Sequence, residues 1–172
     1  MELKKITRLS MLLALSIVLS LVESVIPLFS GIIPGLKLGL ANTVVLTVLY
    51  LYSFKDAIYL SLLRVILIGI LRTGLFSIPF LFSLGGAFLS IIVMSIFKKT
   101  KLSIVGVSVL GSIFHSIGQI IVAFLILNNN TMFYYLPFLL IFSIPTGVIT
   151  GLISKELIKY LKNNWFSKKN II

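Results

Sequence analysis

The sequence contains no cysteine, one histidine and only four acidic residues among 172. The lack of cysteine excludes disulfides, thiolate metal ligands and a cysteine nucleophile. The single aspartate, Asp56, cannot form the aspartate-rich motif of magnesium–diphosphate chemistry. Motifs typical of serine hydrolases, zinc proteases and nucleotide-binding P-loops are also absent from the sequence. We therefore expect a protein that is not an enzyme, holds no metal or cofactor, and does not hydrolyse ATP by itself.

Charged residues are also scarce. They make up 11% of the chain, against 59% hydrophobic residues, whereas about a quarter of a soluble domain is charged. This composition predicts an integral, multi-pass protein of the plasma membrane. The net charge of +11 would suggest nucleic acid in a soluble protein. Here the basic residues form short clusters between apolar runs, which is typical of topology signals, so we expect no nucleic-acid partner.

Six apolar runs, separated by short turns, predict an all-α bundle of six transmembrane helices in one domain, residues 1–172. A helix needs about 20 residues to cross ~30 Å of hydrocarbon. The predicted helices cover residues 6–26, 35–52, 57–71, 78–97, 102–127 and 133–157, followed by a basic tail over 158–172.

The basic residues predict that both termini are cytoplasmic. With six spans, twelve of the fifteen fall on the side of the N-terminus, as the positive-inside rule requires. The exceptions are Lys37 and Arg72 at the outer side and Arg64, about 12 Å into the third span. An arginine at that depth costs at least ~2.5–3.5 kcal/mol, so Arg64 should face the bundle interior with a partner.

Other polar residues stand at corresponding depths. Glu23 lies near the outer end of the first span, and it either serves a functional site or forms a structural ion pair with Lys37 or Arg72. In the fifth span, His115 and Gln119 share one helical face with Ser112. His115 is then either a hydrogen-bonded core residue or part of a site.

Two further stretches are ambiguous. Around Lys37 and Asn42, at the start of the second span after Pro34, the sequence fits either a membrane-entry turn with a snorkelling lysine or the lip of a ligand site, which we favour. Ser10 and Ala14 form a small-xxx-small pair near the cytoplasmic end of the first span, where a partner membrane protein could dock.

The run Pro34-Gly35-Leu36-Lys37-Leu38-Gly39-Leu40-Ala41-Asn42 resembles the signature of the Gx transporter family, often labelled heptaprenyl diphosphate synthase component I. The resemblance covers nearly the whole chain. Further matches are Glu23, Leu63-Arg64, Ser83-Leu84-Gly85-Gly86 and His115-Ser116-Ile117-Gly118-Gln119. The chain departs from the family pattern at Ser116, where asparagine is usual, and at Arg72, where a small residue is expected.

Such families resemble the substrate-binding S components of energy-coupling factor (ECF) transporters. The resemblance implies a six-helix bundle that captures a ligand from outside and works with a membrane T subunit and two ATPases. Ser10 and Ala14 are the nearest match to the docking motif of the first helix. We expect the pocket toward the outer face, with a small, anionic, isoprenoid- or quinone-related ligand bound by Glu23, Lys37, Asn42, Arg64, Arg72, His115 and Gln119.

Two other functions stay open at this point. The family label suggests a non-transporting membrane partner of a polyprenyl diphosphate synthase. An intramembrane enzyme using Glu23 or His115 is the least favoured, because no nucleophile or metal set accompanies these residues.

Overall fold

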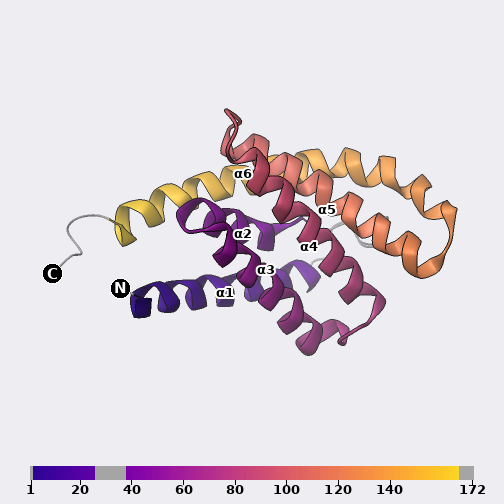
Figure 1. The fold of residues 1–172 in the computed structure, drawn as a ribbon, viewed down its shortest axis with the longest axis horizontal. Helices are drawn as coiled ribbons and strands as arrows, with labels where there is room; N and C mark the ends of the chain where they lie inside the picture. Colours follow the sequence, from indigo (N-terminus) through magenta and orange to yellow (C-terminus); the bar gives the residue numbers. More distant parts are fainter. Residues whose placement is uncertain (1, 26–37, 167–172) are drawn as a thin grey trace.

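The computed structural model describes residues 2–25 and 38–166, and within these ranges it contains helices and no strand (Figure 1). The elements are α1 (Glu2–Val25), α2 (Leu40–Leu51), α3 (Phe54–Ile68), the π-helical turn η1 (Gly69–Thr73), α4 (Ile78–Phe97), α5 (Ile104–Leu127), the 3₁₀ helix η2 (Asn130–Tyr135) and α6 (Leu136–Trp165).

Four of the helices, α1, α4, α5 and α6, are long and apolar enough to cross a membrane. The architecture is therefore that of a multi-pass membrane protein. The 12 residues of α2 span about 18 Å and the 15 residues of α3 about 22 Å, both short of ~30 Å. The expected six full-length spans thus correspond to four long helices and two short ones.

Two helix bounds differ most from those that the sequence predicted. Helix α2 begins at Leu40 and not at residue 35, because Gly39 has a left-handed φ of 77° that precedes the first helical turn. Residues 35–37 lie outside the described residues. At the other end of the chain, α6 continues to Trp165, so most of the predicted tail is helical.

Serine residues begin three of the helices. Ser53 forms a capping box with Asp56 at the start of α3, and Ser77 and Ser103 cap the first turns of α4 and α5. The single aspartate of the chain therefore has a structural role. Its carboxylate also pairs with the Lys5 ammonium at 2.8 Å.

Helix α2 lies between α1 and α6, and α5 packs beside α6 (Figure 1). Glycines bring α5 very close to its two neighbours. A Cβ atom placed on Gly118 would lie 3.0 Å from the Gly86 Cα of α4, and one on Gly147 of α6 would lie 2.6 Å from the Val109 Cα. Close backbone contact of this kind is how helices associate in membranes, where dispersion forces replace the hydrophobic effect.

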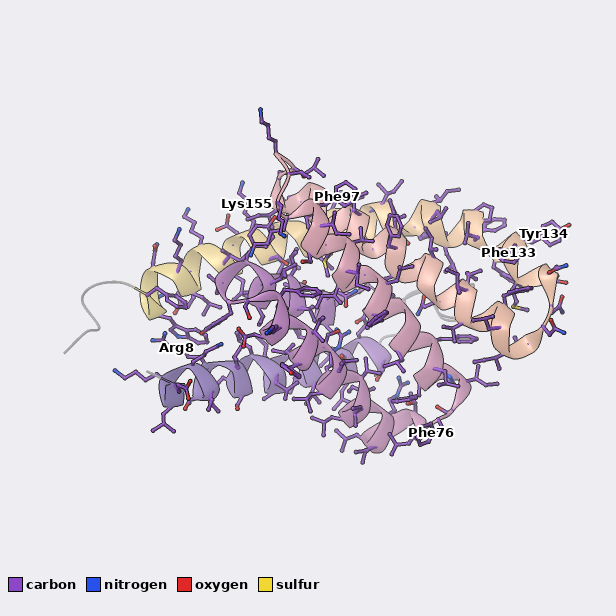
Figure 2. The ribbon with its side chains drawn as sticks, viewed as in Figure 1. Arg8, Phe76, Phe97, Phe133, Tyr134 and Lys155 are labelled. Atoms are coloured by element: carbon purple, nitrogen blue, oxygen red, sulfur yellow. The ribbon has the colours of Figure 1, made fainter. Side chains whose placement is uncertain are left out.

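Both ends of the described chain lie at one end of the molecule, which we call the basic end (Figure 1). Figure 2 shows Arg8 between α1 and the end of α6, where its guanidinium lies 5.4 Å from the Trp165 ring centroid and 5.2 Å from that of Phe166. The ammonium of Lys98, just after α4, donates to the Leu49 carbonyl at 2.6 Å, and burial lowers its pKa.

A large apolar cluster fills the bundle next to the basic end, and we call it the basic-end core. It centres on α2, where Val44, Val48 and Leu49 are at most 1% exposed. Leu12, Ile91, Val107 and Leu161 bring α1, α4, α5 and α6 into the same cluster. Every long helix is therefore anchored at this end.

Candidate ligand-binding site

A polar cavity of about 90 Å³ lies in the half of the bundle away from the basic end. Its lining comes from the last turns of α1, the start of α2, the end of α3 with η1, the start of α4, the middle of α5 and the first half of α6. All six α-helices contribute, so the bundle as a whole fixes its shape.

The structure brings six of the seven candidate residues to this one cavity. The six are Glu23, Asn42, Arg64, Arg72, His115 and Gln119. The seventh, Lys37, lies outside the described residues. Their shared location is a structural finding, and their role in binding stays a prediction.

Arg64 is the most deeply buried charged residue described, at 6% exposure. Its Nη1 donates to the Asn42 Oδ1 at 3.2 Å, and Glu23 attracts it electrostatically. An arginine has five N–H donors. One is held by Asn42, which orients the guanidinium toward the cavity, and the others can serve an anion there.

Glu23 also holds the chain at the start of α2, because its carboxylate accepts a hydrogen bond from the Gly39 backbone N–H. Gly39 can direct its N–H this way because its φ is positive, a conformation that glycine adopts at no steric cost. The carboxylate therefore links the end of α1 to the start of α2. It also attracts the Arg64 guanidinium electrostatically.

The π-helical turn η1 carries Arg72 to the rim of the cavity. Such turns are often found at functional sites, where they redirect a side chain. Arg72 is exposed, and its Nη2 donates to the Ser24 carbonyl at 3.2 Å. Eight residues of regular helix would separate Arg64 and Arg72 by about 80°. The wider turn changes that angle, yet both arginines still line the same cavity.

The α5 face forms another wall of the cavity, with His115 and Gln119 one turn apart. Gly86 of α4 makes room for His115, since a Cβ there would lie 2.9 Å from its Nε2. Ser116, where the resemblance led us to expect asparagine, hydrogen-bonds to Ser143 of α6 at 2.7 Å. The departure from the family pattern therefore leaves a polar link between α5 and α6.

Hydroxyl groups of α1 and α6 complete the lining, and the sequence reasoning did not assign them to the site. They belong to Ser20, Ser143 and Thr146. The spacing of Ser143 and Thr146 along one helical face was the available signal. Ser10 and Ala14 are both exposed on α1, away from the cavity, and their docking role stays a prediction.

A family model described as heptaprenyl diphosphate synthase component I matches residues 12–157. The chain belongs to this family. The match contains the whole described lining of the cavity, from Ser20 to Thr146. The name of the family connects it with isoprenoid synthesis, and the words "component I" imply a further component. No curated protein and no solved structure matches the chain.

The chemistry of the cavity suits an anion with hydrogen-bonding groups. Two guanidinium groups can bind a carboxylate or phosphate through charge-assisted hydrogen bonds, and the amides and hydroxyls around them can orient the rest of the molecule. Among the described residues there is no group of three His, Asp or Glu side chains that could hold a metal ion.

Proposed function

We propose that the chain is the substrate-binding S component of an ECF-type uptake transporter. It binds a small anionic ligand, isoprenoid- or quinone-related, from outside the cell. The observation that carries this proposal is the cavity that Arg64 and Arg72 share, in which Glu23 is the one acidic residue among those described. The arginines outnumber the carboxylate, so the described lining favours a negatively charged guest.

The proposed topology has six membrane crossings in one domain, with both termini in the cytoplasm and the protein in the plasma membrane. The basic end supports this orientation, because Lys5, Arg8 and Lys98 from two separate basic clusters lie there. Phe133 and Tyr134 project at the opposite end (Figure 2), as aromatic residues do at a membrane–water interface. In this orientation the cavity opens toward the outside.

The proposed partners are a membrane T subunit and two ATPases, because the chain has no nucleotide-binding motif with which to drive uptake. The T subunit would dock on α1 at Ser10 and Ala14. The exposed α1 face also includes Met11 and Val18, at 60% and 54% exposure. In this proposal the chain binds and releases its ligand and catalyses no reaction.

As the alternative we propose a non-transporting membrane partner of a polyprenyl diphosphate synthase, which the wording of the family description suggests. That partner would be a soluble enzyme held at the basic end. The two functions predict different complexes, so one experiment separates them.

Native mass spectrometry of protein purified from its own membranes is that experiment. We expect a bound small anion together with a T subunit and ATPases. Recovery of a prenyl synthase without an ATPase would overturn the transport function in favour of the alternative.

Charge-neutralising variants test the ligand site itself. The double variant Lys37→Gln/Arg72→Gln should lose the bound molecule while it stays folded. A matched control, Lys155→Gln/Lys159→Gln, removes the same charge from exposed positions of α6 and should keep it. Equal retention of the molecule by both double variants would contradict the assignment.

A further inference from the structure

A second cavity adjoins the first, and its character is apolar. It has a volume of about 220 Å³ and lies between α4, α5, η2 and α6. Its lining residues are Phe82, Gln119, Ile120, Ala123, Met132, Tyr135 and Leu139. We call it the apolar cavity and the first one the polar cavity.

Gln119 and Leu139 line both cavities, so the two spaces meet at these side chains. Both are buried, at 7% and 4% exposure. Within the described part of the chain, no residue hydrogen-bonds to the Gln119 carboxamide. The Gln119 amide atoms are not among the polar atoms that are buried without a partner, so they keep access to the cavity space, where a polar ligand atom at the junction could bond to them.

The volumes indicate how a ligand would divide between the two cavities. The polar cavity is smaller than the ~300–1,000 Å³ of a usual ligand pocket, and it has room for a compact charged group only. A dry cavity of ~150 Å³ holds benzene. By that measure the apolar cavity takes roughly six to nine carbons.

We infer that the ligand is an amphipathic anion with a short tail. Its charged group lies between Arg64 and Arg72 in the polar cavity, and its apolar tail passes Gln119 and Leu139 into the apolar cavity. This inference rests on the proposed function, which supplies the anion site. It adds a limit on tail length, so that a short-chain acid or phosphate fits and a long polyprenyl chain does not.

Chain-length series provide the test. The probes are straight-chain carboxylates, from butyrate to palmitate, and the monoalkyl phosphates of the same lengths. Binding is measured by equilibrium dialysis against protein in lipid nanodiscs, with binding to empty nanodiscs subtracted. Burial of each methylene contributes about fourfold in affinity, so affinity should rise with length and level off at a tail of roughly six to nine carbons.

A pair of variants locates the tail. Met132→Trp fills part of the apolar cavity, so the affinity should level off at a shorter tail length. Tyr134→Trp is the matched control on the same 3₁₀ helix, because Tyr134 is 78% exposed and lines neither cavity. It should leave the whole series unchanged.

Arg72→Gln separates the inference from the proposed function. If Arg72→Gln weakens the binding of every probe by a similar factor, and Met132→Trp shortens the tail length at which affinity levels off, the anion site and the tail inference both stand. If binding needs Arg72 but does not depend on tail length or on Met132, the tail inference is wrong and the anion site remains. If no probe of either series binds in an Arg72-dependent way, the anion site and the inference built on it are both wrong.

Discussion

The two ends of the bundle are built differently. At the basic end, α2 is enclosed on all sides, and Val44 and Val48 are completely buried. At the cavity end, the buried apolar residues form small clusters, such as Ile120 with Leu139, and polar groups line open space between them. The difference shows that close packing at one end can hold the helices together while the other end keeps an open cavity.

The largest expected effect is on stability, and it should depend on which end is changed. Leu49→Ala in the basic-end core should lower the free energy of unfolding by about 2–5 kcal/mol, because the enclosed site cannot collapse around the missing atoms. Leu139→Ala should cost less, because it enlarges space that is already open. Unfolding of both variants by SDS in detergent micelles measures the difference, and equal losses would contradict the contrast between the ends.

The second prediction concerns the close contact of α4 and α5. Gly118→Ala should cost about 1–3 kcal/mol of stability, because the new Cβ meets Gly85 and Gly86 backbone atoms. Gly111→Ala is the matched control on the same helix, since there the new atom meets the flexible Met94 side chain. The midpoint temperature of thermal unfolding should be much lower for Gly118→Ala than for Gly111→Ala. The reverse order would show that the two helices can separate freely.

The third prediction tests whether Asn42 orients Arg64. Asn42→Ala removes the acceptor of a charged donor, a loss of about 1.5–3 kcal/mol in stability. Asn42→Asp keeps an acceptor but adds negative charge beside the cavity. It should therefore retain stability and still weaken binding of the carboxylate and phosphate probes.

Measured in parallel by unfolding and by equilibrium dialysis, the two Asn42 variants should separate the two effects. Comparable stability losses in both would show that the hydrogen bond to Arg64 does not hold the guanidinium in place.

The smallest expected effect comes from the link between α5 and α6. Ser116→Ala removes its hydrogen bond to Ser143, and such bonds average about 0.6 kcal/mol in membrane proteins. The Ser143 hydroxyl keeps its bond to the Leu139 carbonyl, so no buried donor is left without a partner. A double-mutant cycle with Ser143→Ala measures the coupling, and a value of several kcal/mol would show that the cavity end is more rigid than we describe.

Helical periodicity was enough to predict the spatial grouping of several site residues. His115 and Gln119 lie four positions apart and face the cavity together, and Arg64 points into the bundle because a charge facing lipid would be costly. The bounds of α4, 78–97, also follow from its apolar run, which Ser77 caps and the basic turn after Phe97 ends.

Contacts between residues far apart in the sequence determine the features that could not be predicted from it. The start of α2 depends on the hydrogen bond between Glu23 and Gly39, which are 16 positions apart. The apolar cavity exists because side chains of four elements leave space between them. The extension of α6 did have a signal. Leu157, Leu161 and Trp165 recur every four residues and pack on the basic-end core, but the lysines among them resemble a solvated tail.

The π-helical turn at Gly69–Thr73 makes the site sensitive to chain length as well as to side chains. A π-helical turn holds one residue more than an α-helical turn. Deleting one residue, such as Ile70, would restore a regular helix and rotate the following positions by about 100°. A homologue with one residue fewer here could have the same lining residues in its sequence and still present Arg72 and Thr73 elsewhere. If the cavity binds the proposed anion, a single-codon deletion here would therefore change ligand preference without any substitution in the cavity.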